Sequence, residues 1–194
     1  MTKYKIAKRV LHFTILICFI ALIFAVSILL TQHVASDESA KALVQEFGYV
    51  GVLLISFITG LSMISPVPAA AFTPIFTAGG MGIITVIALA VAGTMLANFI
   101  SYAIGRLGND FTNTHYPKLQ KRIVKIYTER KELLPYLVFA FAAFVPLPDE
   151  VYLIPLGIIG VKLREFILPL FLGTIFFQAV TAFGFDNIFQ LILK

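Results

Sequence analysis

Two adjacent carboxylates, Asp149 and Glu150, stand in an apolar stretch and are the residues best suited to proton or ion chemistry. They are the only charged residues between Leu133 and Val161. A carboxylate at the centre of a bilayer costs about 2.5–3.5 kcal/mol, so the pair would be unfavourable on a helix that faces lipid. Facing a water-filled cavity, the pair could take up protons or cations and act as a coupling site. In the structural alternative, one of the two acids caps a helix that begins after Pro148.

Two amides and a row of small residues mark the segments that must surround this pair. Asn98 and Gln178 each lie within an apolar run, where an amide either bonds a neighbouring helix or faces a polar cavity. Both interpretations stay open, and both amides are candidate transport residues. Small residues also recur at every fourth position along one run, a spacing that lets a second helix approach closely. This row consists of Gly93, Ala97, Ser101 and Gly105, and Gly173 is a further packing candidate.

The other reactive residue types form no catalytic or metal-binding pattern. The three histidines are scattered along the sequence, and neither G-x-S-x-G nor H-E-x-x-H occurs. The single cysteine, Cys18, excludes both an intramolecular disulfide and a cysteine cage for a metal. We therefore expect no enzymatic activity, no metal and no cofactor.

The composition indicates that the chain resides in a lipid bilayer. Of its 194 residues, 59% are apolar and 13% are charged, and no charged residue occurs in the 59 positions between Glu46 and Arg106. A water-soluble domain of this size cannot bury so long a charge-free run. The sequence therefore predicts an all-α integral membrane protein that folds as one helical bundle.

The positions of Lys and Arg predict how the chain crosses the membrane, because cytoplasmic loops are enriched in them. Basic residues at 3–9 precede an apolar run at 10–30, which we interpret as an uncleaved anchor with a cytoplasmic N-terminus. A second basic cluster, at 118–131, should also be cytoplasmic. One full span plus one hairpin that enters and leaves on the same side fits both the length and the charges between these clusters. We place the hairpin at residues 44–80 and the span at 82–105.

The second half of the chain poses the same problem. Residues 133–161 are long for one kinked span and short for two, so a second re-entrant hairpin, entering from the cytoplasm, keeps Lys162 and Arg164 inside. Residues 165–185 then form the last span. The loop at 116–132 is interpreted as a basic amphipathic helix in the anionic membrane interface. Prolines are the predicted hairpin breaks: Pro66, Pro68 and Pro74 in the first hairpin, and Pro146, Pro148 and Pro155 in the second.

The two halves also match each other at an offset of 80 residues. The matched positions are Pro66 with Pro146, Pro68 with Pro148, Gly80 with Gly160, Gly93 and Thr94 with Gly173 and Thr174, and Asn98 with Gln178. Because one half enters from outside and the other from the cytoplasm, the repeat would be inverted. Inverted repeats with broken helices are a recurrent plan of transporters, whose site lies near the midplane where the breaks meet.

The stretches FTPIFTAGGMG and AGTMLANFISYAIGRLGND and the second proline hairpin are similar to the DedA family, also called the VTT-domain or SNARE-associated Golgi family. The resemblance covers residues 44–185. It implies two facing re-entrant hairpins and the movement of lipids, including polyprenyl-phosphate carriers, across the membrane. Arg106 matches the arginine of the family's YAIGRLG motif and is a further candidate transport residue.

The chain departs from the family pattern at both hairpin tips. Ala69 and Ala70 stand where the family often has an acid, and Asp149 and Glu150 stand where it often has arginines. The acidic function would then have moved to the other repeat. An acidic tip repels an anionic phosphate headgroup unless the tip is protonated.

These observations divide the chain into a basic segment with an anchor, residues 1–35, and a DedA-like transport domain, residues 43–194. The domain comprises a first repeat at 43–105, a basic loop at 106–132 and a second repeat at 133–185. We expect a lipid flippase or scramblase in the plasma membrane of a prokaryote, with proton coupling as an open question. The expected partners are membrane lipids and protons, with no nucleic acid, and a homo-oligomer stays open. The alternatives are a membrane organiser or assembly factor that transports nothing, and a small-solute or ion exchanger.

Overall fold

The computed structural model describes residues 18, 22, 25–61, 69–115, 124, 127–129, 131–145 and 148–192. Within these residues every regular element is a helix, which confirms the predicted all-α class. In chain order the elements are α2 (Glu38–Gly60), η1 (Ala69–Phe72), α3 (Thr73–Ala78), α4 (Ile83–His115), η2 (Lys131–Leu133), α6 (Leu134–Phe144), α7 (Glu150–Ile158), η3 (Leu163–Glu165) and α8 (Ile167–Ile192). A further helix, Ala25–Ser36, precedes α2.

The described helices carry the surface of a membrane protein. Three of them are long and apolar enough to cross a bilayer, namely α2, residues Ile83–Asn109 of α4 and residues Ile167–Gly184 of α8. Large apolar side chains stand exposed on their outer faces, including Leu54, Ile84, Leu107 and Leu168. So much exposed apolar surface is unfavourable in water, whereas in a bilayer it contacts the lipid chains. The membrane class is therefore confirmed, and α4 and α8 are long and apolar enough to be the two full spans predicted beyond the anchor.

Both of these helices extend past their predicted ends. α4 has 33 residues, about 50 Å of helix, and continues through Arg106 to His115, where the sequence predicted a loop. α8 runs to Ile192, past the predicted end at residue 185. The predicted spans ended before the first charged residue, Arg106 or Asp186, because the prediction counted apolar residues. A helix tolerates polar residues and continues until its backbone pattern is interrupted, and no proline follows in α4 before Pro117.

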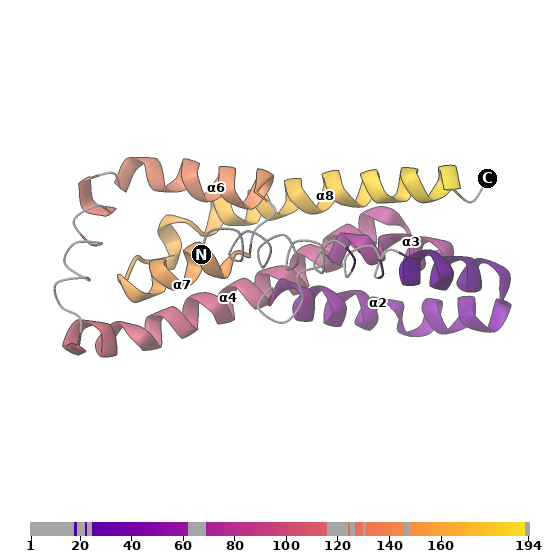
Figure 1. Ribbon diagram of the computed structural model, residues 1–194, viewed down its shortest axis with the longest axis horizontal. Coiled ribbons are helices and arrows are strands. Elements are labelled where there is room, and N and C mark those ends of the chain that lie inside the picture. The colour runs from indigo at the N-terminus through magenta and orange to yellow at the C-terminus, as the bar shows by residue number, and fades with distance from the viewer. Residues whose placement is uncertain are drawn as a thin grey trace, which may run out of the picture.

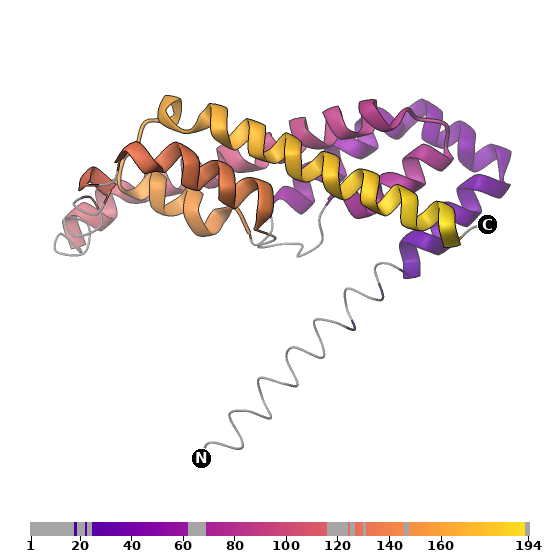
Figure 2. The same ribbon diagram turned by 90° about the horizontal axis from the view of Figure 1, so that it is seen from above.

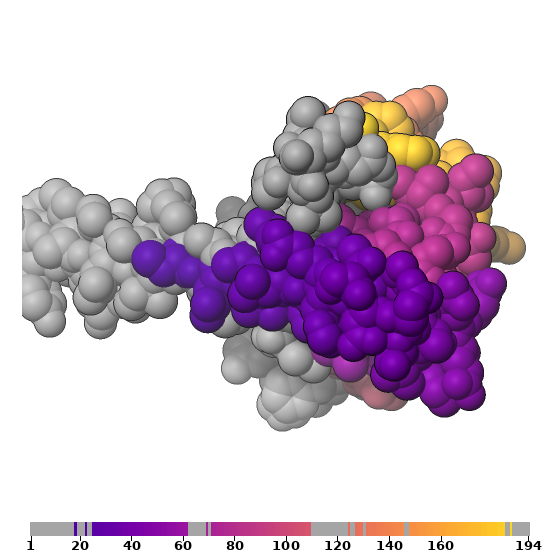
Figure 3. Space-filling view, turned by 90° about the vertical axis from the view of Figure 1, so that its right-hand side faces the viewer, coloured from indigo at the N-terminus to yellow at the C-terminus, as the bar shows by residue number. Residues whose placement is uncertain are grey.

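α4 is the central helix, and other elements pack along its two halves (Figure 1). α2 and α3 lie along the half that begins at Ile83, and α7 lies along the other half, with α6 packed on α8. α8 runs antiparallel to α4, because Phe166 meets Tyr102 at a ring distance of 5.5 Å and Gln178 meets Thr94. Figure 2 shows α8 extending along the bundle. The end of the bundle where α2 begins is largely covered by α2 and the helix before it (Figure 3).

Small residues lie at the closest contacts between helices. A Cβ atom on Gly93 would lie 2.5 Å from the carbonyl oxygen of Leu53 in α2. Gly105 of α4 and Gly157 of α7 face each other with no space for a Cβ on either, and Gly173 of α8 packs against α6. The two remaining members of the predicted row are also buried, Ala97 and Ser101. The row therefore lies where α4 contacts α2 and α7.

α3 and α7 end in the same way, 80 residues apart. Gly80 and Gly160 have positive φ angles of 93° and 78°, which glycine adopts without strain. The next residues, Met81 and Val161, each donate their N–H to the carbonyl five positions earlier, at 3.0 and 3.1 Å. This bond closes the end of a helix around a left-handed glycine. The two halves of the chain thus share a local structure at the predicted offset.

The first arm of the first hairpin is longer than predicted. α2 begins at Glu38 with Asp37 as its N-cap, and its 23 residues could cross a membrane by length alone. Its last residue, Gly60, nevertheless lies beside Ala97, at the middle of the apolar part of α4. A Cβ on Gly60 would lie 2.8 Å from that of Ala97.

The helix Ala25–Ser36 packs into the bundle through its polar residues. Ser27 and Thr31 are 0% and 2% exposed. The Ser27 hydroxyl donates a hydrogen bond of 2.9 Å to the carbonyl oxygen of Ala71 in η1. In lipid, a backbone carbonyl outside a regular α-helix needs a hydrogen-bond partner within the protein. Ser27 provides this partner for the carbonyl of Ala71. The basic N-terminus, most of the predicted anchor and most of the loop at 116–132 lie outside the described residues.

Candidate functional site at the centre of the bundle

A cluster of polar side chains lies between α4, α7 and α8. Asn98, 1% exposed, donates from Nδ2 to Oδ2 of Asp149 across 2.9 Å. One turn earlier on α4, Thr94 accepts a hydrogen bond of 3.0 Å from Nε2 of Gln178. Both amides singled out in the sequence therefore bond other parts of the fold. Asn98 joins α4 to the residue before α7, and Gln178 joins α8 to α4.

Asp149 occupies the N-cap position of α7, but in the described structure its side chain caps none of the helix N–H groups. Its Oδ1 atom accepts from the hydroxyl of Tyr152 at 3.0 Å, and its Oδ2 atom accepts from Asn98. The backbone of Asp149 is already helical (φ −62°, ψ −23°), whereas a capping side chain needs an extended backbone. The capping alternative therefore does not hold for Asp149.

Glu150 is the first residue of α7 and is only 7% exposed. Positions 150, 154 and 157 share one face of a helix. Ile154 and Gly157 both contact Gly105 of α4, so Glu150 faces α4 one turn nearer to the bundle centre. Among the described residues, neither carboxylate oxygen of Glu150 has a hydrogen-bond partner.

The helices that carry the cluster also form a buried apolar core. This core includes Val91, Met95, Leu153 and Leu170, and Tyr152 packs against it. An ionised group in such surroundings is unfavourable unless it is paired. Two adjacent carboxylates here favour the uptake of a positive charge, either a proton or a cation.

Arg106, the other candidate transport residue, does not join this cluster. It lies two turns beyond Asn98 on α4, about 12 Å along the helix axis. Its side chain is exposed, and a Cβ on Gly160 would lie 3.1 Å from its Nη1 atom. Arg106 therefore belongs to the end of the bundle, beside the turn that closes α7.

The predicted proline breaks differ in their placement. Pro74 lies in the first turn of α3, where a helix needs no N–H, and Pro148 directly precedes Asp149. Pro155 does not break the second hairpin, because it lies inside α7 and the helix continues to Ile158. The helix loses one internal hydrogen bond at Pro155 and tolerates the loss. The three remaining predicted breaks lie outside the described residues, namely Pro66, Pro68 and Pro146.

Two members of the cluster, Tyr152 and Thr94, were not predicted as site residues. Tyr152 lies three positions after Asp149, a spacing that brings side chains together on a helix. Thr94 lies four positions before Asn98 and thus on the same face of α4. Helical spacing from the predicted residues would have found both of them.

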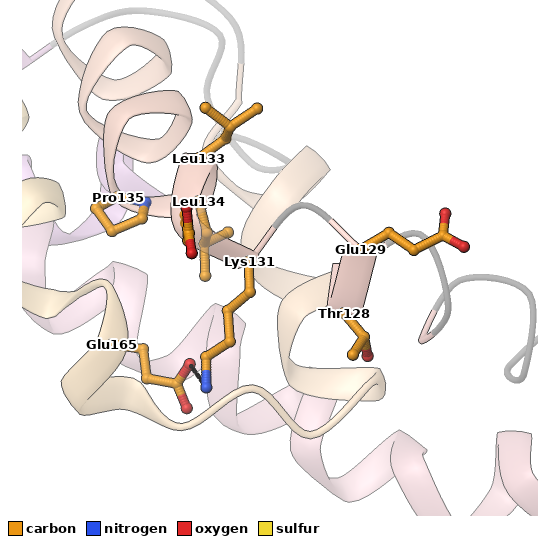
Figure 4. A pocket seen from close by; sticks show the side chains of 8 residues that line it. Thr128, Glu129, Lys131, Leu133, Leu134, Pro135 and Glu165 are labelled. Carbon is orange, nitrogen blue, oxygen red and sulfur yellow. Dashed lines mark ion pairs between the residues drawn. The ribbon is translucent and has the colours of Figure 1, made fainter.

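A second polar cluster lies at the end of the bundle near η2 and η3. The Tyr127 hydroxyl donates to Oε2 of Glu165 at 2.6 Å. Nζ of Lys131 lies 3.2 Å from the same oxygen, and Figure 4 shows this ion pair. The hydrogen bond from Tyr127 and the charge of Lys131 hold the pKa of Glu165 below its usual range. Burial and the bond to Glu165 raise the pKa of Tyr127 to about 12. These residues join the segment before α6 to the turn before α8, beside a depression of about 870 Å³.

These features define an all-α integral membrane protein with a cluster of polar side chains between α4, α7 and α8. The family model of the VTT domain matches residues 67–187, more than half of the chain. The chain therefore belongs to the VTT-domain family, which is the DedA or SNARE-associated Golgi family. Comparison with curated proteins and with solved structures gave no match. The matched region contains the whole central cluster.

Proposed function

We propose that this protein moves lipids across the membrane as a flippase or scramblase of the DedA type, and that its polar centre takes up protons. The observation that carries the proposal is that two interrupted segments end at the same height of α4. Gly60, the end of α2, lies beside Thr94 and Ala97, and Asp149, before α7, bonds Asn98. In transporters, broken helices that meet near the midplane form the substrate and ion sites.

Contacts within the first hairpin support a re-entrant path. Gly48 lies beside Met81 and Gly51 beside Phe76, so α3 returns antiparallel to α2. α4 then begins on the side from which α2 came. From Gly48 to Gly60 the helix rises about 18 Å, which is less than the hydrocarbon thickness of about 30 Å.

Contacts within the second hairpin support the mirrored path from the opposite end. Phe144, the end of α6, meets Phe176 in the middle of α8 at a ring distance of 5.1 Å. α7 then runs from the bundle centre to the end of α4 that carries Arg106 (Figure 1). With the shared helix endings at Gly80 and Gly160, this arrangement supports an inverted repeat.

The positions of the basic residues support a cytoplasmic N-terminus for the proposed transporter. The proposed location of the protein is the plasma membrane.

The charge of the polar centre bears on the substrate. An ionised pair at Asp149 and Glu150 would repel an anionic phosphate headgroup, whereas a neutralised pair would not. We therefore couple headgroup passage to proton uptake at this pair. Membrane lipids are the proposed partners, and the cluster is assigned no enzymatic role.

Reconstitution of the full chain into liposomes with fluorescent phospholipids tests the proposed function. Dithionite quenches only label in the outer leaflet. Wild-type protein should therefore expose label that stays protected in protein-free liposomes and in liposomes with an unrelated helical membrane protein. Lipids with neutral, zwitterionic and anionic headgroups should be compared at matched protein content. Correctly inserted protein that moves none of them would refute lipid transport and favour the membrane-organiser alternative.

A further inference from the structure

Four buried side-chain oxygens at the bundle centre lack a hydrogen-bond partner among the described residues. They are Oδ1 of Asn98, Oε1 of Gln178 and both carboxylate oxygens of Glu150. The three residues are 1%, 4% and 7% exposed. All four atoms are acceptors in these orientations, and a buried acceptor without a partner is unfavourable by about 1–3 kcal/mol. The group that they require is therefore positively charged or rich in donors.

Hydrogen bonds and the chain itself connect the residues that carry these oxygens. Asn98 and Thr94 are neighbours on one face of α4, and Gln178 is bonded to Thr94. Asn98 is bonded to Asp149, whose neighbour Glu150 faces α4. Because only the NH₂ group of an amide can face a carboxylate, Oδ1 of Asn98 must point away from Asp149.

The two carboxylates differ in the hydrogen bonds that their oxygens accept. Both oxygens of Asp149 already accept hydrogen bonds, from Asn98 and Tyr152, whereas neither oxygen of Glu150 does. The carboxylate oxygens that lack a partner are therefore those of Glu150. Other titratable or charged groups on the packed elements lie further along α4: Tyr102 bonds the carbonyl of Val161, and Arg106 is exposed beside Gly160.

A single proton would not satisfy this set of atoms. Protonation of Glu150 would turn one oxygen into a donor for one amide oxygen, and two acceptors would still lack a partner. A dehydrated metal cation binds several oxygens at once. Mg²⁺ gives up its water reluctantly, and the Glu150 carboxylate, whose oxygens have no hydrogen-bond donor, matches a single positive charge.

We propose that the bundle centre binds Na⁺ through the Glu150 carboxylate and the side-chain oxygens of Asn98 and Gln178. The Na⁺ site deepens the proposed function, because it rests on the same carboxylates. Binding is measured without lipid movement, however, so lipid transport and Na⁺ binding can fail separately.

The test is thermal unfolding of the purified full chain in detergent, titrated with NaCl against choline chloride at constant ionic strength. At pH 8 the unfolding temperature should rise with Na⁺ and saturate, and ²³Na NMR line broadening should report the same affinity. Glu150→Gln should weaken the apparent affinity about tenfold or more, as loss of a ligand does, whereas Glu132→Gln, at an exposed carboxylate, should leave it unchanged. If Glu150→Gln fails to fold, the wild type alone decides.

Equal stability in NaCl and choline chloride would overturn the proposal. So would an Na⁺ response that survives Glu150→Gln. An equal response to KCl would overturn the choice of Na⁺.

Discussion

The Nδ2 atom of Asn98 lies 2.9 Å from Oδ2 of Asp149, 51 positions later in the chain, and joins the middle of α4 to the start of α7. This bond fixes the height on α4 at which α7 begins. It also leaves the neighbouring Glu150 facing α4, in the polar centre. A side chain in the middle of α4 thus positions the acids at the start of α7.

Asn98→Ala should destabilise the fold. Asp149 would keep only the hydrogen bond from Tyr152, and loss of a buried hydrogen bond to a charged group costs about 1.5–3 kcal/mol. The measurement is the free energy of unfolding in detergent, by denaturant titration. Asn187→Ala is the matched control, because Asn187 is exposed and its amide bonds only the backbone of its own helix. Equal effects of the two substitutions would argue against a structural role for the Asn98 bond.

Gly93→Ala should also destabilise the protein. Its new Cβ would lie 2.5 Å from the carbonyl oxygen of Leu53 and 2.8 Å from Cβ of Ser56, so α2 and α4 would have to separate. Overpacking of this kind costs about 1–3 kcal/mol. Gly184→Ala has no atom within 4 Å of the new Cβ and should be neutral or stabilising. The same unfolding measurement compares the two, and a Gly93 variant as stable as the Gly184 variant would contradict the described packing.

The sequence predicts the features of this fold that depend on neighbouring residues, and it misses those that depend on contacts between distant segments. Charge-free runs and basic clusters predict the class and the full spans α4 and α8, because hydropathy is a local property. They do not predict that α4 continues to His115, since helix ends depend on backbone patterns. They also miss the bond between Ser27 and Ala71, which joins segments 44 positions apart. Asp149 and Glu150 stand out in the sequence as the only charges in an apolar run. That Asp149 has hydrogen-bond partners and Glu150 has none among the described residues depends on where Asn98 and Tyr152 lie in the fold.

Cysteine labelling should place both ends of the first hairpin on one side of the membrane. In a Cys18→Ser background, Glu38→Cys and Gly82→Cys should react with an impermeant reagent from outside, and Lys162→Cys only after permeabilisation. All three positions are exposed, and a Cβ on Gly82 has space. If positions 38 and 82 react from opposite sides, α2 crosses the membrane fully and the re-entrant path is wrong.

Tyr127→Phe should raise the pKa of Glu165 toward its ordinary value of about 4.3. The hydrogen bond from Tyr127 is the main cause that lowers the pKa, with Lys131 adding to it. A carboxyl with a lowered pKa in the folded state contributes stability above its unfolded pKa, and this contribution is lost as the pH falls through the folded value. Carboxyl ¹³C NMR with labelled glutamate should follow the titration, with Lys131→Met as a second variant that shifts it the same way. No shift in the Tyr127 variant would show that the hydrogen bond does not form.

Lipid movement as a function of pH tests the central claim most directly. The double variant Asp149→Asn, Glu150→Gln keeps side-chain size but removes ionisation, and it should insert at least as well as wild type. Flux of fluorescent phospholipid in liposomes is measured from pH 5 to pH 8 at matched protein content, with Glu132→Gln as the control. We predict a flux that depends on pH in the wild type and the control, and a flux that stops or loses this dependence in the double variant. A pH profile unchanged in the double variant would contradict proton uptake at the polar centre.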